Sequence, residues 1–175
     1  GMLYKILVVG DNGTHERIPA WTTRAVQDDA TKNFSAQFWN PAEPFDWQGD
    51  GFRVNASEGL FIYECHIGMS SEEEKVNSYD EFRRDVLPRI AKLGYNCLQI
   101  MAIQEHPYYG SYGYHVSNFF APSSRFGTPE ELKALVRKAH DMNIAVIMDI
   151  VHAHYVKNFA EGINELDGSP NLYSL

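Results

Sequence analysis

Residues 145–154 read Ala-Val-Ile-Met-Asp-Ile-Val-His-Ala-His, a short apolar run that carries one carboxylate and two imidazoles at its end. A run of this length after a helical pattern predicts a buried parallel strand over residues 144–150. Burying an unpaired charge is costly, so the polar side chains should stand where the strand ends. We therefore expect Asp149, His152 and His154 at the carboxyl-terminal edge of a parallel sheet, where barrel enzymes have their active sites.

The elements before this strand alternate between strand and helix. Apolar runs at residues 60–66 and 96–101 predict two further strands. Capping boxes at Ser78–Glu81 and Thr128–Glu131 mark the starts of two helices, and Pro88 is expected to bend the first of them. The resulting β-α-β-α-β order predicts an α/β fold with parallel strands and right-handed crossovers.

Composition divides the chain into three segments. Residues 1–40 hold short extended pieces separated by turn residues, as in the last strands of a β-domain. Residues 41–58 carry Pro, Gly and Asp without periodicity, so we expect a linker. The alternation of strands and helices begins at residue 59.

Charge and composition narrow the classes of partner. The 175 residues are 44% hydrophobic, enough for a real core, and the net charge is 15 − 23 = −8. The absence of a Lys/Arg run argues against nucleic acid, and no stretch is long enough to span a membrane. We expect Cys65 and Cys97 to be buried free thiols, which suits a reducing compartment and a cytoplasmic location.

The cluster of Asp149, His152 and His154 allows three interpretations. It can bind a sugar or another polar ligand through hydrogen bonds, or it can chelate zinc through the H-x-H pair and the carboxylate. It can also be a structural carboxylate beside surface histidines. The spacing alone leaves all three open.

A long loop over residues 102–127 separates the second strand from the second helix and is rich in aromatic residues. Loops of this length inside a compact α/β unit are usually functional. The glycine-containing stretch from Tyr109 to His115 either presents a ring to a sugar or is a loop packed by its own aromatics. The stretch from Gln104 to His106 is either an acid/base pair or a hydrogen-bond network within the loop.

Four stretches closely resemble one family: residues 61–68, 98–106, 112–129 and 149–154. They resemble the 1,4-alpha-glucan branching enzymes of the eukaryotic-like type, in the alpha-amylase family (glycoside hydrolase family 13). Residues 17–21 and 34–41 resemble the end of that family's N-terminal carbohydrate-binding β-sandwich of the family 48 type. The resemblance implies that residues 59–175 supply the first three β-α units of a (β/α)8 TIM barrel, after the sandwich tail in residues 1–40 and a linker in residues 41–58.

The resemblance also implies an activity. Branching enzymes transfer a cut alpha-glucan chain of amylose, glycogen or starch to a 6-hydroxyl by a retaining mechanism that needs two carboxylates and no metal or organic cofactor. It implies that Tyr114 stacks on the sugar and that Asp149 and His154 line the same subsite. The family usually has Ser where Ala153 stands and Ala where Pro107 stands, which leaves these three residues intact.

The family places its nucleophile and its acid/base after the fourth and fifth strands, beyond Leu175. We therefore expect no catalytic residue among these 175 residues, no branching activity from them alone, and self-association through an unpaired third strand. Two other functions stay open: a non-catalytic alpha-glucan-binding or scaffold module and, less favoured, a metal-dependent hydrolase that uses His152 and His154.

Overall fold

The computed structural model describes residues 1–55 and 57–170. The chain divides into two compact units, which are described separately. The antiparallel unit consists of Gly1–Pro41, Ile103–Ser124 and the segment from Ile150 onward, and the parallel unit consists of Ala42–Ala102 and Arg125–Asp149. Among the described residues, no helix is long and apolar enough to cross a membrane.

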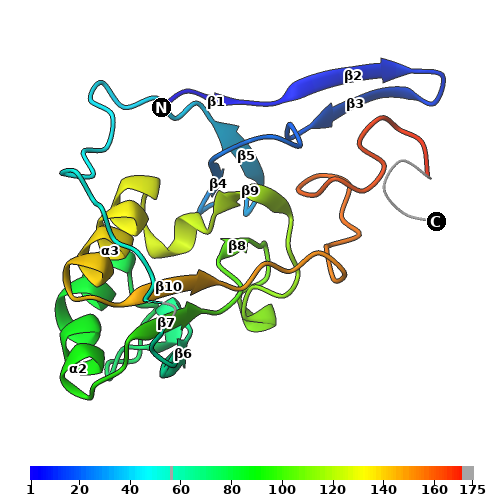
Figure 1. The fold of residues 1–175 in the computed structure, drawn as a ribbon. Helices are drawn as coiled ribbons and strands as arrows, with labels where there is room; N and C mark the ends of the chain where they lie inside the picture. Colours follow the sequence, from blue (N-terminus) through cyan, green and yellow to red (C-terminus); the bar gives the residue numbers. More distant parts are fainter. Residues whose placement is uncertain (56, 171–175) are drawn as a thin grey trace. The chain divides into compact units, whose positions relative to one another are not determined.

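The parallel unit is built on a three-stranded sheet in the order β10-β7-β6 (Figure 1). Its strands are β6 (Ile62–Cys65), β7 (Cys97–Ile100) and β10 (Ala145–Met148). Both pairings are parallel and in step, since Cys97 lies opposite both Ile62 and Ala145. The three parallel strands predicted from the sequence are thus confirmed, each with slightly shorter bounds.

The first helix of this unit contains a π-helical turn before its proline. It runs through α1 (Tyr79–Glu81), the π segment η2 (Phe82–Val86) and α2 (Leu87–Lys92). The N–H of Leu87 donates to the carbonyl of Phe82, five residues back. Because Pro88 has no N–H and its ring crowds the preceding turn, the wider turn accommodates it. The bend expected at Pro88 stays a prediction, since what the structure shows before the proline is a π turn. Gly94, at φ +86°, follows the end of the helix.

Both predicted capping boxes are present. Ser78 begins α1, and Thr128 begins α3 (Pro129–Asp141); each accepts a hydrogen bond from the N–H of the glutamate three residues later. Helix α3 packs against β10 and against the first helix, and apolar side chains of the helices and the sheet are buried between them (Figure 1). The largest fully buried side chains of the unit include Tyr79, Phe82, Leu87, Ile90, Leu98, Ile100 and Leu135.

The segment predicted as a linker lies against α3 within the parallel unit. Nδ1 of His140 is 2.5 Å from Oδ2 of Asp50, and the ring of Phe52 stacks on the imidazole at 4.5 Å. Arg137 donates to the carbonyl of Asp46 at 2.9 Å. A side-chain hydrogen bond, a ring stack and a backbone contact therefore hold this part of the segment on the helix.

The antiparallel unit contains one sheet and one hairpin from the start of the chain. The sheet has the order β1-β5-β4, with bounds β1 (Leu3–Tyr4), β4 (Ala25–Gln27) and β5 (Phe34–Gln37). The hairpin pairs β2 (Ile6–Gly10) with β3 (Gly13–Arg17). Ile18, Ala25, Phe34 and Ala36, which lie in or beside the sheet, form a small buried core.

The long aromatic loop contains a strand pair that the sequence did not predict. Strand β8 (Gln104–Glu105) pairs with β9 (Asn118–Pro122). The 3-10 turn η3 (Tyr109–Ser111) lies between the two strands, and η4 (Ser124–Phe126) follows β9. A two-residue strand is too short to show periodicity, so only the structure could reveal it.

Both cysteines are free and buried, as expected. Burial raises the pKa of the Cys65 thiol to about 12, and the charge of Glu64 adds to this effect. Burial also raises the pKa of Cys97. Since the thiolate is the reactive form, these cysteines are packing residues in the folded chain.

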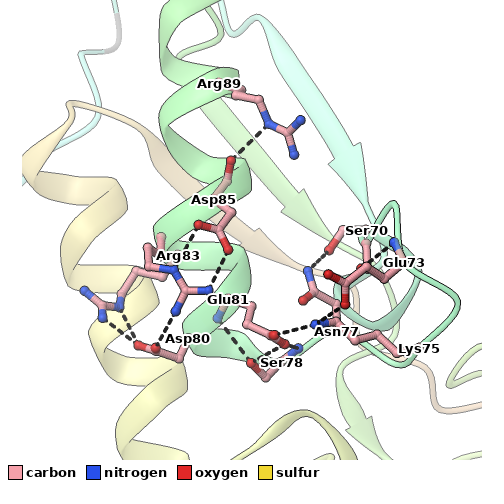
Figure 2. Close-up of polar contacts among 12 residues, drawn as sticks. Ser70, Glu73, Lys75, Asn77, Ser78, Asp80, Glu81, Arg83, Asp85 and Arg89 are labelled. Carbon is pink, nitrogen blue, oxygen red and sulfur yellow. Dashed lines mark hydrogen bonds and ion pairs between the residues drawn. The ribbon is translucent and has the colours of Figure 1, made fainter.

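Glu81 provides a prediction about acid stability. Figure 2 shows its carboxylate among Ser78 and Lys75: it accepts the N–H of Ser78 at 3.1 Å and pairs with Nζ of Lys75 at 2.8 Å. Lys75 first, and then Ser78, lower the pKa of Glu81 to about 2. A lowered folded-state pKa gives stability that is present above the unfolded value and is lost as the pH falls toward about 2. We expect Glu81→Gln to reduce the pH dependence of the unfolding free energy over this range, measured by urea unfolding.

The matched control is Glu58→Gln, which changes an exposed glutamate outside this network. It should keep the pH dependence of the parent chain. Equal pH dependence in the parent chain and in Glu81→Gln would contradict the assignment.

Self-association remains a prediction, and the structure shows which strands would mediate it. Among the described residues, β6 and β10 each pair on one side only, and Ile62, Ile147 and Met148 are exposed. We expect light scattering after size exclusion to give a mass above 19.9 kDa that rises with concentration. Ile147→Lys should shift the protein toward the monomer, and Leu93→Lys, at an exposed position after α2, should not. A monomer at every concentration would reject the prediction.

Candidate functional site

Asp149 stands directly after β10, at the carboxyl edge of the parallel sheet. Its N–H donates to the carbonyl of Ile100 at 3.0 Å, which extends the ladder by one residue. On the other side of β7, the N–H of Met101 donates to the carbonyl of Cys65 at 2.9 Å. The residues after the three strands, His66, Met101 and Asp149, therefore follow one edge. The structure thus places Asp149 at the strand end predicted from the sequence.

Tyr114 lies in the aromatic loop of the antiparallel unit. Its N–H donates to the carbonyl of Ser111 at 3.0 Å, and its side chain is half-buried. Tyr112 adopts a left-handed conformation with φ 55°, and Gly113 follows with φ 91°. Two successive positive φ angles turn the chain sharply immediately before Tyr114, so the glycine is required there.

His154 lies in an exposed segment of the same unit. The N–H of Val156 donates to the carbonyl of Val116 at 2.9 Å, which ties this segment to the aromatic loop. Tyr114 and His154 each stand two residues before one partner of that bond. Nearby, the ring of Phe119 stacks on His152 at 5.6 Å. Backbone pairing and ring stacking therefore bring the two segments that carry Tyr114 and His154 together.

Gln104 joins three parts of the antiparallel unit. Its buried amide donates from Nε2 to the carbonyl of Phe119 at 3.0 Å, and its Oε1 accepts the N–H of Val151 at 2.9 Å. One side chain thus satisfies a backbone acceptor of β9 and a backbone donor of the segment that leads to His154. This role of Gln104 could not be predicted from the sequence, because an amide at a strand end has no pattern that identifies its partners.

Glu105 and His106 support the loop from inside. Glu105 is buried, and its carboxylate accepts the N–H of Ser124 at 2.7 Å and the hydroxyl of Ser123 at 3.2 Å. Nδ1 of buried His106 donates to the carbonyl of Gln104 at 2.9 Å. The interpretation of these residues as a hydrogen-bond network of the loop is confirmed.

The three predicted sugar-binding residues are divided between the units. Asp149 belongs to the parallel unit, and Tyr114 and His154 belong to the antiparallel unit. Their common subsite stays a prediction. Within residues 1–55 and 57–170, no group of three or more His, Cys, Asp or Glu side chains could hold a metal ion, so the zinc interpretation finds no ligand set there.

Comparison with known proteins assigns the family. The model of the alpha-amylase catalytic domain matches residues 84–173. The chain belongs to the alpha-amylase family. A solved structure of a putative alpha amylase from Salmonella typhimurium has the same fold, with a TM-score of 0.70 at 21% identity over 91% of this chain and 26% of that one.

Curated relatives of this alpha-amylase family member are more similar in sequence. The 1,4-alpha-glucan-branching enzyme of Aspergillus oryzae is 52% identical over 90% of this chain and 23% of its own length. That of Saccharomyces cerevisiae is 47% identical over 96% of this chain and 25% of its own length. The 1,4-alpha-glucan-branching enzyme 2-2 of Arabidopsis thaliana is 50% identical over 99% of this chain and 22% of its own length. The chain spans about a quarter of the length of these relatives.

The role of Gln104 leads to a stability prediction. Gln104→Leu would leave the Phe119 carbonyl and the Val151 N–H without their buried partner, at a cost of about 2 kcal/mol of unfolding free energy. Urea unfolding measures the loss. The matched control is Gln99→Leu, which removes a more accessible amide that donates to Glu64 at 3.0 Å, and it should cost less than about 0.5 kcal/mol. Equal losses would contradict the assigned role.

Proposed function

We propose that this chain is part of a 1,4-alpha-glucan branching enzyme, which cuts an alpha-1,4 chain and transfers it to a 6-hydroxyl of glycogen or starch. The observation that carries the proposal is the 47–52% identity, over at least 90% of the chain, to proteins of that name. The alpha-amylase family includes hydrolases, so membership in the family alone would not decide whether water or a glucan accepts the cut chain. The relatives' shared name favours a glucan acceptor over water.

The proposed substrate residues are Tyr114, Asp149 and His154. The Tyr114 ring would stack on the apolar face of a glucose unit. Asp149 would accept hydrogen bonds from the hydroxyls of that glucose, and His154 would donate or accept hydrogen bonds with them. The placement of Asp149 at the carboxyl edge of the sheet supports this role, because barrel enzymes bind substrates at that edge. The reaction uses no metal and no organic cofactor.

The domain assignment is part of the same proposal. Residues 59–175 would supply the first three β-α units of a (β/α)8 barrel, and residues 1–40 the last strands of a β-sandwich joined by a linker in residues 41–58. The parallel order β10-β7-β6 and the antiparallel sheet β1-β5-β4 support it. The nucleophile and acid/base would come from later barrel strands, outside the three described here. The two free thiols favour a cytoplasmic location.

The test is a chimera in which residues 1–175 replace the matching quarter of the Saccharomyces cerevisiae branching enzyme. We expect the chimera to lower the iodine absorbance of amylose and to raise the number of chains released by a debranching enzyme. Tyr114→Ala, Asp149→Asn and His154→Ala should each lower kcat/KM at least about tenfold, because each removes a contact to the bound sugar.

The control in the chimera is Tyr112→Ala, which removes an exposed ring of the same loop without a proposed contact to the sugar. Its activity should equal that of the parent chimera. Release of reducing ends without new branches would indicate hydrolysis and reject the branching assignment. A folded chimera that changes amylose in neither way would reject the enzyme assignment and favour a glucan-binding module.

A further inference from the structure

The antiparallel unit contains a cavity of about 500 Å³ that the proposed sugar subsite does not use. Its wall is formed by Trp21, from the chain that leads into β4, by Phe119 and Phe120 of β9, and by His152 and Ile163 of the segment after β10. Gln104 reaches the same cavity from β8. The volume lies within the range of small-ligand sites, which is about 300–1,000 Å³.

Two aromatic rings form the exposed side of this cavity. Trp21 and Phe120 are stacked, with ring centroids 4.5 Å apart and an interplanar angle of 18°. Both remain accessible, since 76% of Trp21 and 52% of Phe120 are exposed. A stacked pair that keeps so much surface in water offers a flat apolar face to a ligand. Large aromatic side chains of this kind usually contribute much of the energy of a binding surface.

The chemistry of the lining selects an uncharged ligand. Among the described residues that line the cavity, none is Asp, Glu, Lys or Arg, and His152 is the single titratable side chain. Phosphorylated and acidic ligands would find no fixed cation here. A pyranose has an apolar face for a ring and hydroxyls at its edge for an imidazole, which matches Trp21 and His152.

The position of His152 connects the cavity to the proposed substrate. His152 precedes His154 by two residues and is exposed, and its ring is held by stacking on Phe119. The N–H of Val151, one residue earlier, is held by Gln104, which also lines the cavity. The segment that carries His154, a residue proposed to bind the sugar, therefore also forms part of the cavity wall.

We propose that Trp21 and Phe120 form a second alpha-glucan-binding surface, with His152 as its hydrogen-bonding group. This inference rests on the proposed function, because the occupant is a further stretch of the same polysaccharide. The surface holds a glucan chain by stacking and is a binding site with no part in bond cleavage.

The test measures the binding of maltoheptaose to the 175-residue protein by calorimetry and by saturation-transfer NMR. We expect Trp21→Ala and Phe120→Ala each to weaken binding at least about tenfold, and Trp21→Phe to retain part of the affinity. Cellopentaose, with β-linkages, should bind more weakly than maltoheptaose. Circular dichroism and the melting temperature show whether each variant is folded, and Trp21→Phe serves as the second variant if Trp21→Ala is not.

Two matched controls test whether the effect belongs to this cavity. Trp47→Ala removes an indole that is 40% exposed, and Phe38→Ala removes a phenyl ring that is 60% exposed, both outside the cavity lining. Both should bind maltoheptaose like the parent protein. Equal weakening by the controls would overturn the proposal, because it would show unspecific contact with exposed rings.

The remaining outcomes separate this surface from the proposed function. If Tyr114→Ala abolishes binding and Trp21→Ala leaves it unchanged, the second surface is rejected and the proposed substrate site stands. If the chimera is inactive but Trp21→Ala and Phe120→Ala still abolish binding, the surface stands and the branching assignment fails. No binding by the parent protein at about 10 mM maltoheptaose, or a change in oligomeric mass without a change in glucan affinity, overturns the proposal.

Discussion

The in-step pairing of β7 with both of its neighbours is the constraint on which the parallel unit depends. Ile100 lies opposite both Cys65 and Met148, so the three strands end at one level. A slip of one residue would send every side chain of a strand to the other face. The backbone bond from Asp149 to Ile100 exists only in this register. The same pairing that forms the core therefore decides where the carboxylate of Asp149 stands.

Local signals in the helices support that register. Ser78 and Thr128 fix where the helices begin, because each capping box satisfies backbone N–H groups that the first turn leaves unpaired. The π turn before Pro88 takes up the residue that a regular turn cannot accommodate, so the helix continues to Lys92. The starts of both helices are thus determined by short-range chemistry.

These short-range features are the ones that the sequence predicts. Periodicity and caps identify the parallel strands and both long helices, whereas contacts between distant residues leave no local pattern. The hydrogen bond of His140 with Asp50 joins positions 90 residues apart, and Gln104 reaches Val151 across 47 residues. Strand β8 is two residues long and shows no alternation. The same limit applies to the site. The position of Asp149 can be predicted from the strand that precedes it, but its distance from Tyr114 and His154 cannot.

The aromatic loop shows how a long irregular segment can leave its rings available for ligands. Its buried side chains include polar groups: the Glu105 carboxylate and the Gln104 amide satisfy backbone and hydroxyl groups that would otherwise be buried without partners. Because hydrogen bonds hold the loop, its large rings are not all required as core. Phe120 lies half in water, and Tyr114 follows the sharp turn at Tyr112 and Gly113. The hydrogen bonds of Gln104 and Glu105 thus hold the loop while Phe120 stays accessible, as the proposed glucan-binding surface requires.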